Sequence, residues 1–217
     1  MGLLVAIEGI DGAGKNTLAT ALEKELSARG LRSLRLAFPR YGTRLADVAS
    51  AALHSEKGFL AGSPEAMALL FALDRADALV EIAKLRALSD VLICDRFVAS
   101  NAAYSAARLG EDRFADVAEW IELMEHESLG IPRPDAYFLL PTDVAEAHRR
   151  ADLRAKESEE RRLDSYETDA DLQAATARSY ERLAAENWVA PWFRAGDPTS
   201  TPEESAAVLA ENIVSLA

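Results

Sequence analysis

The sequence predicts one α/β domain in which helices cover both faces of a five-stranded parallel sheet, a doubly wound arrangement. Short, continuous apolar runs recur along the chain and are typical of strands that are buried on both faces of such a sheet. Segments with apolar residues at helical spacing separate these runs. Residues 1–217 contain no Pro/Gly/Ser-rich linker and no internal repeat, so we expect the whole chain to form this single domain.

The first elements are a strand, a glycine-rich turn and a helix. Leu3–Ile7 is a continuous apolar run, and Gly9–Gly14 ends it. Leu18, Leu22 and Leu26 then recur at the spacing of one helical face. A strand that feeds directly into a helix through glycines is the local context of a phosphate-binding turn.

The later elements are bounded by clear breaks. Pro39 ends the second strand, Ser63 precedes a proline at the start of a helical segment, and Thr201 with Glu204 forms a capping box. The further strands are expected at Ser33–Phe38, Val91–Cys94, Tyr137–Leu140 and Trp192–Arg194, and the further helical segments at residues 63–88, at Asp116–Glu127 and after Thr201.

Composition excludes several classes of protein. Hydrophobic residues make up 49% of the 217 and charged residues 28%, which excludes a disordered or fibrous chain. The 36 acidic residues outnumber 24 Lys and Arg, so a net charge of −12 excludes a general binder of nucleic-acid polymers. No apolar run approaches the roughly 20 residues of a membrane span, and we expect no membrane partner. Cys94 is the single cysteine, which favours a reducing, cytoplasmic setting.

The glycine-rich turn carries a phosphate-binding motif, Gly9-x-x-x-x-Gly14-Lys15. Its backbone N–H groups would face phosphate oxygens, and Lys15 would add charge for the β- and γ-phosphates. Asn16 stands where the motif usually has the Ser or Thr that helps to hold Mg²⁺, so its amide oxygen or a water would have to serve instead. A glycine turn without a ligand is the alternative interpretation. We expect ATP to be bound by Gly9, Asp11, Gly12, Ala13, Gly14, Lys15, Asn16 and Thr17.

Asp95 and Arg96 directly follow the third predicted strand. They therefore belong to the carboxyl edge of the sheet, where ligands bind in open α/β folds. Asp95 could polarise a metal shell or an acceptor phosphate, or it could instead cap the next helix. Arg96 suits bidentate phosphate binding.

Residues 149–168 depart from the pattern of the rest of the chain. Between Arg149 and Arg162 there are six basic and four acidic residues, so that an acidic chain becomes locally basic. Two interpretations fit this pattern. One is a solvated helix pair with i,i+4 ion pairs, and the other is a mobile lid that carries arginines.

Five blocks of sequence occur in a characteristic order over about residues 3–195. They are Glu8–Lys15 (EGIDGAGK), Phe38–Tyr41 (FPRY), Phe71–Arg75 (FALDR), Asp95–Tyr104 (DRFVASNAAY) and Asp164–Glu167 (DSYE). Together they resemble the thymidylate kinase family, the P-loop kinases that phosphorylate dTMP. The second and fourth blocks are far more specific than the glycine turn alone. The resemblance implies a nucleoside monophosphate kinase architecture with a short lid at about residues 149–163, and it favours the lid interpretation of that segment.

The same resemblance implies an acceptor site for dTMP. Phe71 would stack on the thymine ring, and Arg75 and Asn101 would hydrogen-bond its edge. Tyr104 would lie against the sugar and disfavour a 2′-hydroxyl group. Taken singly, each of these residues has a core-packing alternative. The remaining acceptor-site residues would be Arg40 and Arg96 on the 5′-phosphate, Asp11 near the sugar 3′-OH, Phe38 and Tyr41 in the wall, and Ser100, Arg161, Asp164, Tyr166 and Glu167.

Catalytic and metal sites are implied in the same way. Some members of this family carry a catalytic arginine in the glycine turn, where this chain has Gly12. Others carry it in the lid, and that pattern fits this chain. The expected catalytic residues are Lys15, Asp11, Asp95, Arg96, Arg150 and Arg154, and the expected Mg²⁺ ligands are Asp11, Asp95, Asp164 and Glu167.

The implied reaction is direct, in-line transfer of the ATP γ-phosphoryl group to dTMP, a step in dTTP biosynthesis. A homodimer is also implied. The alternatives are a nucleoside monophosphate kinase with another base preference, a slowly hydrolysing P-loop ATPase that acts as a switch, and an inactive scaffold. A GTPase is excluded because no Asn-Lys-x-Asp motif occurs.

Overall fold

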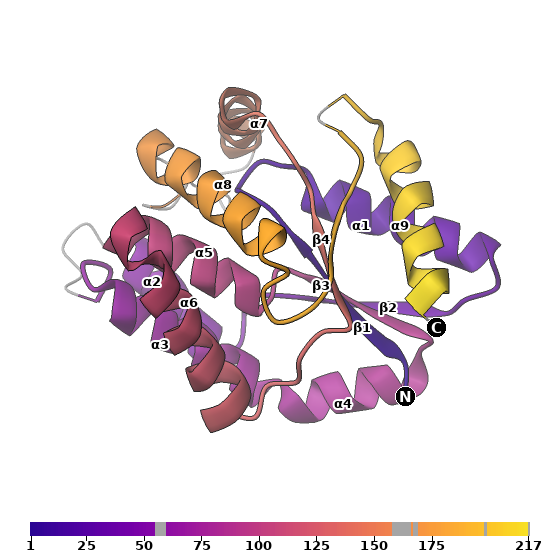
Figure 1. The fold of residues 1–217 in the computed structure, drawn as a ribbon, viewed down its shortest axis with the longest axis horizontal. Helices are drawn as coiled ribbons and strands as arrows, with labels where there is room; N and C mark the ends of the chain where they lie inside the picture. The colour runs from indigo at the N-terminus through magenta and orange to yellow at the C-terminus, as the bar shows by residue number, and fades with distance from the viewer. Residues whose placement is uncertain (55–59, 158–165, 167–168, 198, 217) are drawn as a thin grey trace.

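The computed structural model describes residues 1–54, 60–157, 166, 169–197 and 199–216, with the backbone alone for residues 151–157. Its centre is a parallel sheet with the strand order β2-β3-β1-β4-β5 (Figure 1). The strands are β1 (Leu3–Glu8), β2 (Ser33–Ala37), β3 (Val91–Asp95), β4 (Ala136–Leu139) and β5 (Trp192–Arg194). The doubly wound α/β class predicted from the sequence is confirmed.

The helices cover both faces of this sheet. They are α1 (Lys15–Ala28), α2 (Arg44–His54), α3 (Pro64–Asp77), α4 (Leu79–Leu88), α5 (Val98–Leu109), α6 (Phe114–Glu122), α7 (Val144–Glu157), α8 (Ala170–Ala185) and α9 (Pro202–Leu216). A short 3₁₀ turn η1 (Glu111–Arg113) precedes α6, and a π-helical turn η2 (Leu123–Ser128) follows it. Within the described part of the chain, no helix is both long and apolar enough to cross a bilayer.

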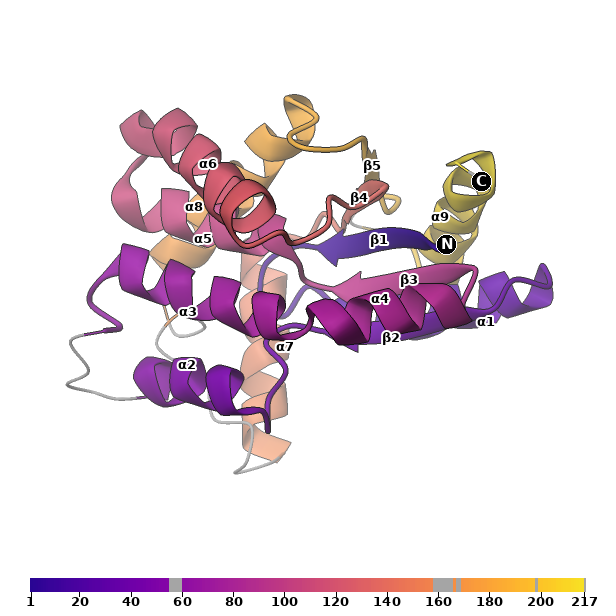
Figure 2. The ribbon, with the colours of Figure 1, turned by 90° about the horizontal axis from the view of Figure 1, so that it is seen from below.

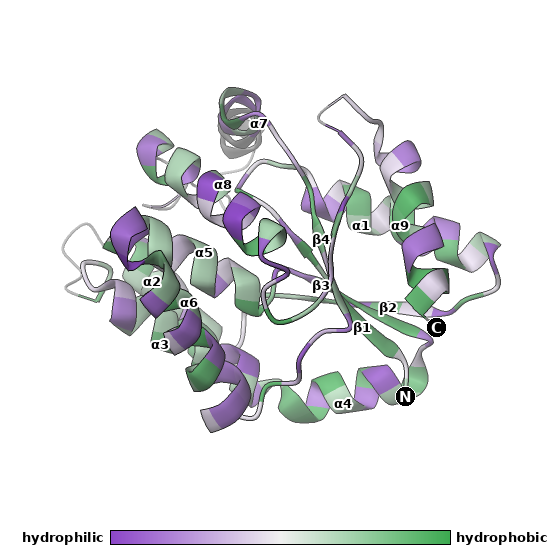
Figure 3. Cartoon of the chain, viewed as in Figure 1, coloured by the Kyte–Doolittle hydropathy of each residue, from purple (hydrophilic) through white to green (hydrophobic). Residues whose placement is uncertain are grey.

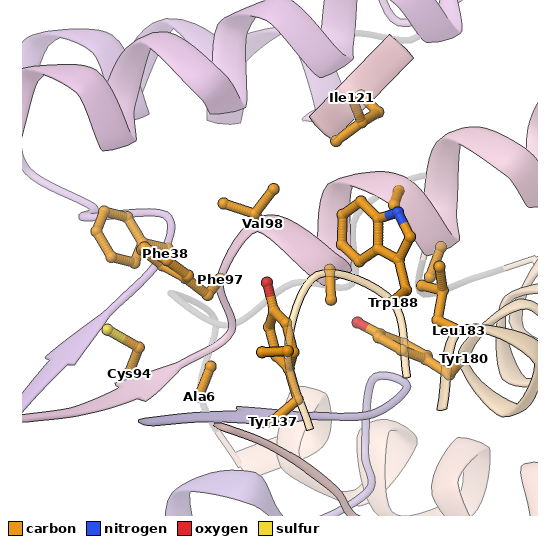
Figure 4. Packing of buried hydrophobic residues seen from close by; sticks show 14 of the residues in the cluster. Ala6, Phe38, Cys94, Phe97, Val98, Ile121, Tyr137, Tyr180, Leu183 and Trp188 are labelled. Atoms are coloured by element: carbon orange, nitrogen blue, oxygen red, sulfur yellow. The ribbon is translucent and has the colours of Figure 1, made fainter. Parts of the chain in front are cut away.

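Strand alternation divides the core into two layers. On β1, Val5 and Ile7 pack with apolar residues of α1 and α9, which lie side by side on one face (Figure 1). Leu4 and Ala6 belong to the larger cluster on the other face, beneath α5, α6 and α8. Figure 4 shows part of this cluster, in which the Tyr137 ring stands near Trp188. The central strands β1, β3 and β4 are buried on both faces, as their apolar runs predicted, whereas the edge strands β2 and β5 are partly exposed. Figure 3 shows β1 as hydrophobic over most of its length.

Two helical segments differ in detail from the sequence expectation. Residues 63–88 form α3 and α4, which follow one another in Figure 2, with a break at Ala78. At this break the Asp74 carbonyl oxygen accepts hydrogen bonds from the Ala78 N–H and also from Arg40. The segment expected at Asp116–Glu127 is α6 continued by η2. The helices at 44–54, 98–109 and 170–185 were not assigned from the sequence.

Candidate active site

The glycine turn joins β1 to α1 at the carboxyl edge of the sheet, as predicted. Lys15, the first residue of α1, is buried, and its ammonium group donates to the carbonyl oxygens of Gly9 (3.0 Å) and Ile10 (2.8 Å). Burial, together with the positive charge of Arg96, lowers the pKa of Lys15 to about 8. The lysine that would bind nucleotide phosphates therefore lies inside the turn, and its charged form is less favoured than that of an exposed lysine.

Helix α7 lies directly against this turn, beyond the carboxyl ends of the strands (Figure 1). A β-carbon on Gly12 would stand 2.0 Å from the carbonyl oxygen of Ala147. One turn further along α7, Arg150 Nη1 lies 3.5 Å from the carbonyl oxygen of Ala13. Arg150 also pairs with Glu146 on its own helix (2.8 Å). The structure thus brings a predicted lid arginine to the phosphate-binding turn.

Asn16 follows Lys15 and is exposed. Its side-chain oxygen accepts a hydrogen bond of 3.0 Å from Arg35 Nη1, which extends from β2. Thr17, the next residue, is also exposed. The oxygen that the sequence suggested as a substitute metal ligand is therefore engaged by a guanidinium group, which disfavours a cation at that atom.

Asp95 ends β3 and Arg96 follows it, next to the start of the glycine turn, with Asp95 in register with Ile7 of β1. Arg96 adopts a left-handed backbone conformation (φ 65°), which is uncommon for a residue other than glycine. Its guanidinium group donates to the Ser100 hydroxyl (3.1 Å) and lies 5.3 Å from the ring centre of Tyr104. The chain therefore places this cation at the edge of the sheet, as the sequence predicted.

Asp11 is held by three side chains. Arg96 Nη2 donates to one carboxylate oxygen, and the Tyr104 hydroxyl (2.6 Å) and Gln173 Nε2 (3.2 Å) donate to the other. Burial opposes the ionised carboxylate, but the charges of Arg96 and Lys15 outweigh it and hold the pKa of Asp11 well below its usual range. Asp11 therefore stays ionised at neutral pH. Gln173 of α8 was not identified from the sequence.

Glu8, at the end of β1, is a completely buried carboxylate that the sequence analysis gave no role of its own. It accepts hydrogen bonds from the Phe97 N–H (2.8 Å) and from the hydroxyl groups of Ser100 (2.6 Å) and Tyr180 (3.1 Å). Burial raises the pKa of Glu8 despite these bonds. The bond to Phe97 satisfies the backbone N–H of the residue that precedes α5.

A cavity opens beside the Asp11 cluster, between the glycine turn, the loop after β2, α3 and α5. Its apolar lining includes Phe38, which is buried against Phe97, and Phe71, which is half-buried. Tyr166 stacks on Tyr104 with a centroid distance of 5.8 Å. The predicted acceptor-site residues that line the cavity are Asp11, Phe38, Tyr41, Phe71, Arg75, Arg96, Ser100, Asn101, Tyr104 and Tyr166.

Two polar residues of this wall, Arg75 and Asn101, meet one buried carboxylate. Arg75 donates to Glu125 through Nε (2.5 Å) and Nη2 (2.7 Å), and Asn101 Nδ2 donates to the same carboxylate (2.7 Å). Burial opposes the charge on Arg75, but Glu125 outweighs it and raises the pKa of the guanidinium group. Glu125 was not identified from the sequence.

Among the predicted acceptor-site residues that the structure describes, Arg40 does not line the cavity. Its guanidinium group donates to Asp74 (3.0 Å), Asp77 (2.6 Å) and Glu81 (3.1 Å), and the Asp74 side chain is almost completely buried. These contacts tie the loop after β2 to α3 and α4. In this structure Arg40 stabilises the packing of the loop against α3 and α4. Its expected contact with a phosphate stays a prediction.

Arg108 lines the same cavity and was not identified from the sequence. It donates to the Tyr166 hydroxyl group and to the carbonyl oxygen of Ala61, so it connects α5 to two other segments. Arg154 lies in the backbone-only part of α7, and Arg161, Asp164 and Glu167 lie outside the described residues.

The carboxylate oxygens near the glycine turn could serve as some of the ligands of a magnesium ion, but they do not form a complete site. Mg²⁺ prefers hard oxygen ligands and is commonly held by one or two carboxylates together with substrate phosphates and water. Asp95 offers such a carboxylate at the end of β3, beside the glycine turn, whereas both oxygens of Asp11 already accept hydrogen bonds, one of them from the Arg96 guanidinium group. The described residues contain no group of three or more His, Cys, Asp or Glu side chains that could hold a metal ion. A single carboxylate at the end of β3 is compatible with an ion whose other ligands are nucleotide phosphates and water.

A phosphate-binding turn at the central strand of a parallel sheet, with a pocket beside it, is typical of a P-loop nucleotide-binding protein. The sequence model of the family described as thymidylate kinase matches residues 7–190. A thymidylate kinase of Mycobacterium tuberculosis is 47% identical over 209 residues, which cover 96% of this chain and 97% of that protein. The chain therefore belongs to the thymidylate kinase family.

More distant relatives agree with this assignment. A thymidylate kinase of Bifidobacterium longum is 32% identical over 219 residues and is matched over 99% of its length, with 100% of this chain covered. Among solved structures, a thymidylate kinase from Candida albicans superposes with a TM-score of 0.75 at 23% identity. The superposition covers 99% of this chain and 92% of that one, and it supports the fold.

Proposed function

We propose that this protein transfers the γ-phosphoryl group of ATP to dTMP, giving dTDP and ADP, with Mg²⁺ as the metal. The observation that carries the choice of acceptor is the pairing of Arg75 and Asn101 in the cavity wall. A guanidinium group can only donate hydrogen bonds, and the amide of Asn101 uses its nitrogen on protein acceptors, which leaves its oxygen to accept. Thymine, with an N3–H donor beside the O4 acceptor, complements this pair.

The two substrates would occupy neighbouring regions. The glycine turn and Lys15 suit the phosphates of ATP. The acceptor base suits the cavity, where the Phe71 ring supplies a stacking face worth roughly 1–3 kcal/mol per base. The acceptor phosphate would then lie near Arg96, between the cavity and the turn.

Phosphoryl transfer depends on positioning the two substrates and on neutralising the charge of the transferring group, and not on a proton transfer by the protein. The attacking phosphate oxygen of dTMP is ionised at neutral pH, so no general base is required. Charge on the transferring group would be neutralised by Lys15, by Arg96 and by Arg150 on α7. Bound Mg²⁺ would supply further positive charge at the phosphates, with Asp95 as the described residue placed to hold it and Asp11 as a ligand that would first have to leave its contact with Arg96.

We further propose that α7 belongs to a lid at about residues 149–163 within a single domain. The closeness of Ala147 to Gly12 and of Arg150 to Ala13 supports this proposal. A lid that covers the turn would exclude water from the reacting phosphates and so suppress ATP hydrolysis. The homodimer and the cytoplasmic setting implied by the sequence stay predictions.

The decisive experiment is ADP release from ATP and Mg²⁺ with dTMP, dUMP, dCMP, dGMP, AMP and UMP offered separately. We expect the highest kcat/KM with dTMP, a lower value with dUMP and values near background with the others. Rapid turnover with a different acceptor would retain a nucleotide kinase and reject the proposed substrate. ADP release that no acceptor stimulates would favour a P-loop ATPase.

A further inference from the structure

Glu125 lies behind the cavity, in the π-helical turn η2, and is completely buried. Arg75 and Asn101 are among the residues that line the cavity, whereas Glu125 is not. Both of these lining residues donate to its carboxylate, from α3 and α5 respectively. One carboxylate outside the cavity surface therefore holds two polar groups that form that surface.

The orientation of the Asn101 amide follows from its partners. Its nitrogen donates to Glu125 Oε1 (2.7 Å) and to the carbonyl oxygen of Ala68 (2.9 Å). Both partners are pure acceptors, so turning the amide over would place its oxygen against two oxygens. The amide is thereby locked with Oδ1 directed away from these partners, as an acceptor.

The orientation of Arg75 is fixed in the same way. Nε and Nη2 form a two-pronged contact with Glu125, which sets the plane of the guanidinium group. Nη1 makes no hydrogen bond to any residue in the described part of the chain, and it remains a donor. Both residues line the cavity, so the atoms that they keep for a ligand are an acceptor on Asn101 and a donor on Arg75, in orientations that Glu125 sets.

We propose that Glu125 is a positioning residue that determines base specificity, because its carboxylate fixes the orientations of this acceptor and this donor. The proposal rests on dTMP as the acceptor substrate. A thymine edge, with N3–H and O4, meets an acceptor and a donor. Cytosine presents the reverse, an N3 acceptor beside an N4 amino donor, so each of its groups faces a like group. Unpaired polar groups in a buried site are what make such discrimination large.

The ionised carboxylate is essential to this role. Three N–H donors share its two oxygens, with Oε1 accepting from both Arg75 and Asn101. A glutamine at position 125 has the same size but only one acceptor atom and brings an N–H₂ group of its own. Glu125→Gln must therefore turn one of the two lining groups away from its present orientation.

The test is equilibrium binding of dTMP and dCMP, by calorimetry without ATP, to the wild-type protein and to Glu125→Gln. We expect the ratio of dTMP affinity to dCMP affinity to fall on the order of tenfold or more in the variant. Affinity for ATP, which the glycine turn determines, should stay unchanged and thereby report an intact fold. Glu122→Gln is the matched control, because Glu122 pairs with Arg133 at the surface of the same helical segment.

Glu125→Asp keeps the charge and serves if Glu125→Gln does not fold. Its shorter side chain must release at least one of the three donors, so its affinity ratio should fall by several-fold while Glu122→Gln keeps the wild-type ratio. A wild-type affinity ratio in a folded Glu125 variant would overturn the proposal and leave the kinase function standing. A wild-type protein that binds dTMP and dCMP equally would overturn both the proposal and the proposed substrate.

Discussion

The carbonyl oxygen of Ala147 lies 2.0 Å from the point where a β-carbon on Gly12 would stand. Gly12 also has a φ of 78°, a conformation that side chains with a β-carbon adopt only with strain. Both constraints require glycine at position 12 while α7 keeps its place. An arginine in the glycine turn is therefore incompatible with this arrangement, and the arginine that reaches the turn comes from α7.

Gly12→Ala should push α7 away from the glycine turn. We expect kcat to fall roughly tenfold to a hundredfold, because small displacements of catalytic groups have effects of that size. Hydrogen–deuterium exchange of the ligand-free protein should show faster exchange in α7.

Gly30→Ala is the matched control for this substitution. Gly30 has the same φ of 78° and no atom within 4 Å of the added β-carbon, so the variant carries the backbone strain without the contact. Equal exchange in α7 for both variants would show that the contact with Ala147 does not hold the helix in place.

Arg150→Met should slow the chemical step while leaving the KM for dTMP near its wild-type value. Arg150 reaches the carbonyl oxygen of Ala13 and does not line the acceptor cavity. Arg149→Met is the control, because Arg149 pairs with the same Glu146 from the same helix and is largely exposed. Single-turnover rates measure the effect. A normal rate in Arg150→Met, or an equal loss in both variants, would contradict a role for Arg150 at the phosphates.

ATP affinity should fall as the pH rises above 8. The pKa of Lys15 is about 8 in the free protein, and bound phosphates favour its charged form, so ATP binding above this pH requires proton uptake. Phosphate groups have already lost their last proton in this range. Calorimetry in buffers of different ionisation enthalpy measures the uptake. Lys15→Met should bind ATP weakly and with a flat profile, and a flat profile in the wild-type protein would refute the assignment.

Arg40→Met should destabilise the fold by about 3 kcal/mol, since it leaves the buried Asp74 carboxylate without its cation. Arg133→Met is the control, because Arg133 pairs with Glu122 and Glu127 at the surface and its loss should cost less than about 1 kcal/mol. Urea unfolding measures both. A tenfold rise in the KM for dTMP with unchanged stability would instead assign Arg40 to the acceptor phosphate.

Local sequence predicts those site residues whose position follows directly from the strands and turns of the backbone. Apolar runs predict parallel strands, parallel strands end at one edge, and the glycine turn and Asp95–Arg96 follow two of those ends. Arg108 could also have been found from the sequence. It follows Asn101 by two helical turns on α5 and so shares its face.

The parts that local sequence does not predict depend on contacts between distant residues. Glu125 lies 50 positions from Arg75, and Gln173 lies 162 positions from Asp11. No periodicity connects such pairs. Arg40 illustrates the same limit, because a sequence shows a charge but not the carboxylates that fold against it.

The π-helical turn at Leu123–Ser128 connects base preference to insertions and deletions in the gene. A π turn holds one residue more than the α-helical turn it replaces, and each residue of an α-helix rotates the chain by about 100°. Loss of a single codon in the part of this turn before Glu125 would restore the α-helix and rotate Glu125 away from Arg75 and Asn101. Substrate choice would then change through a length change in a helical turn that does not line the cavity.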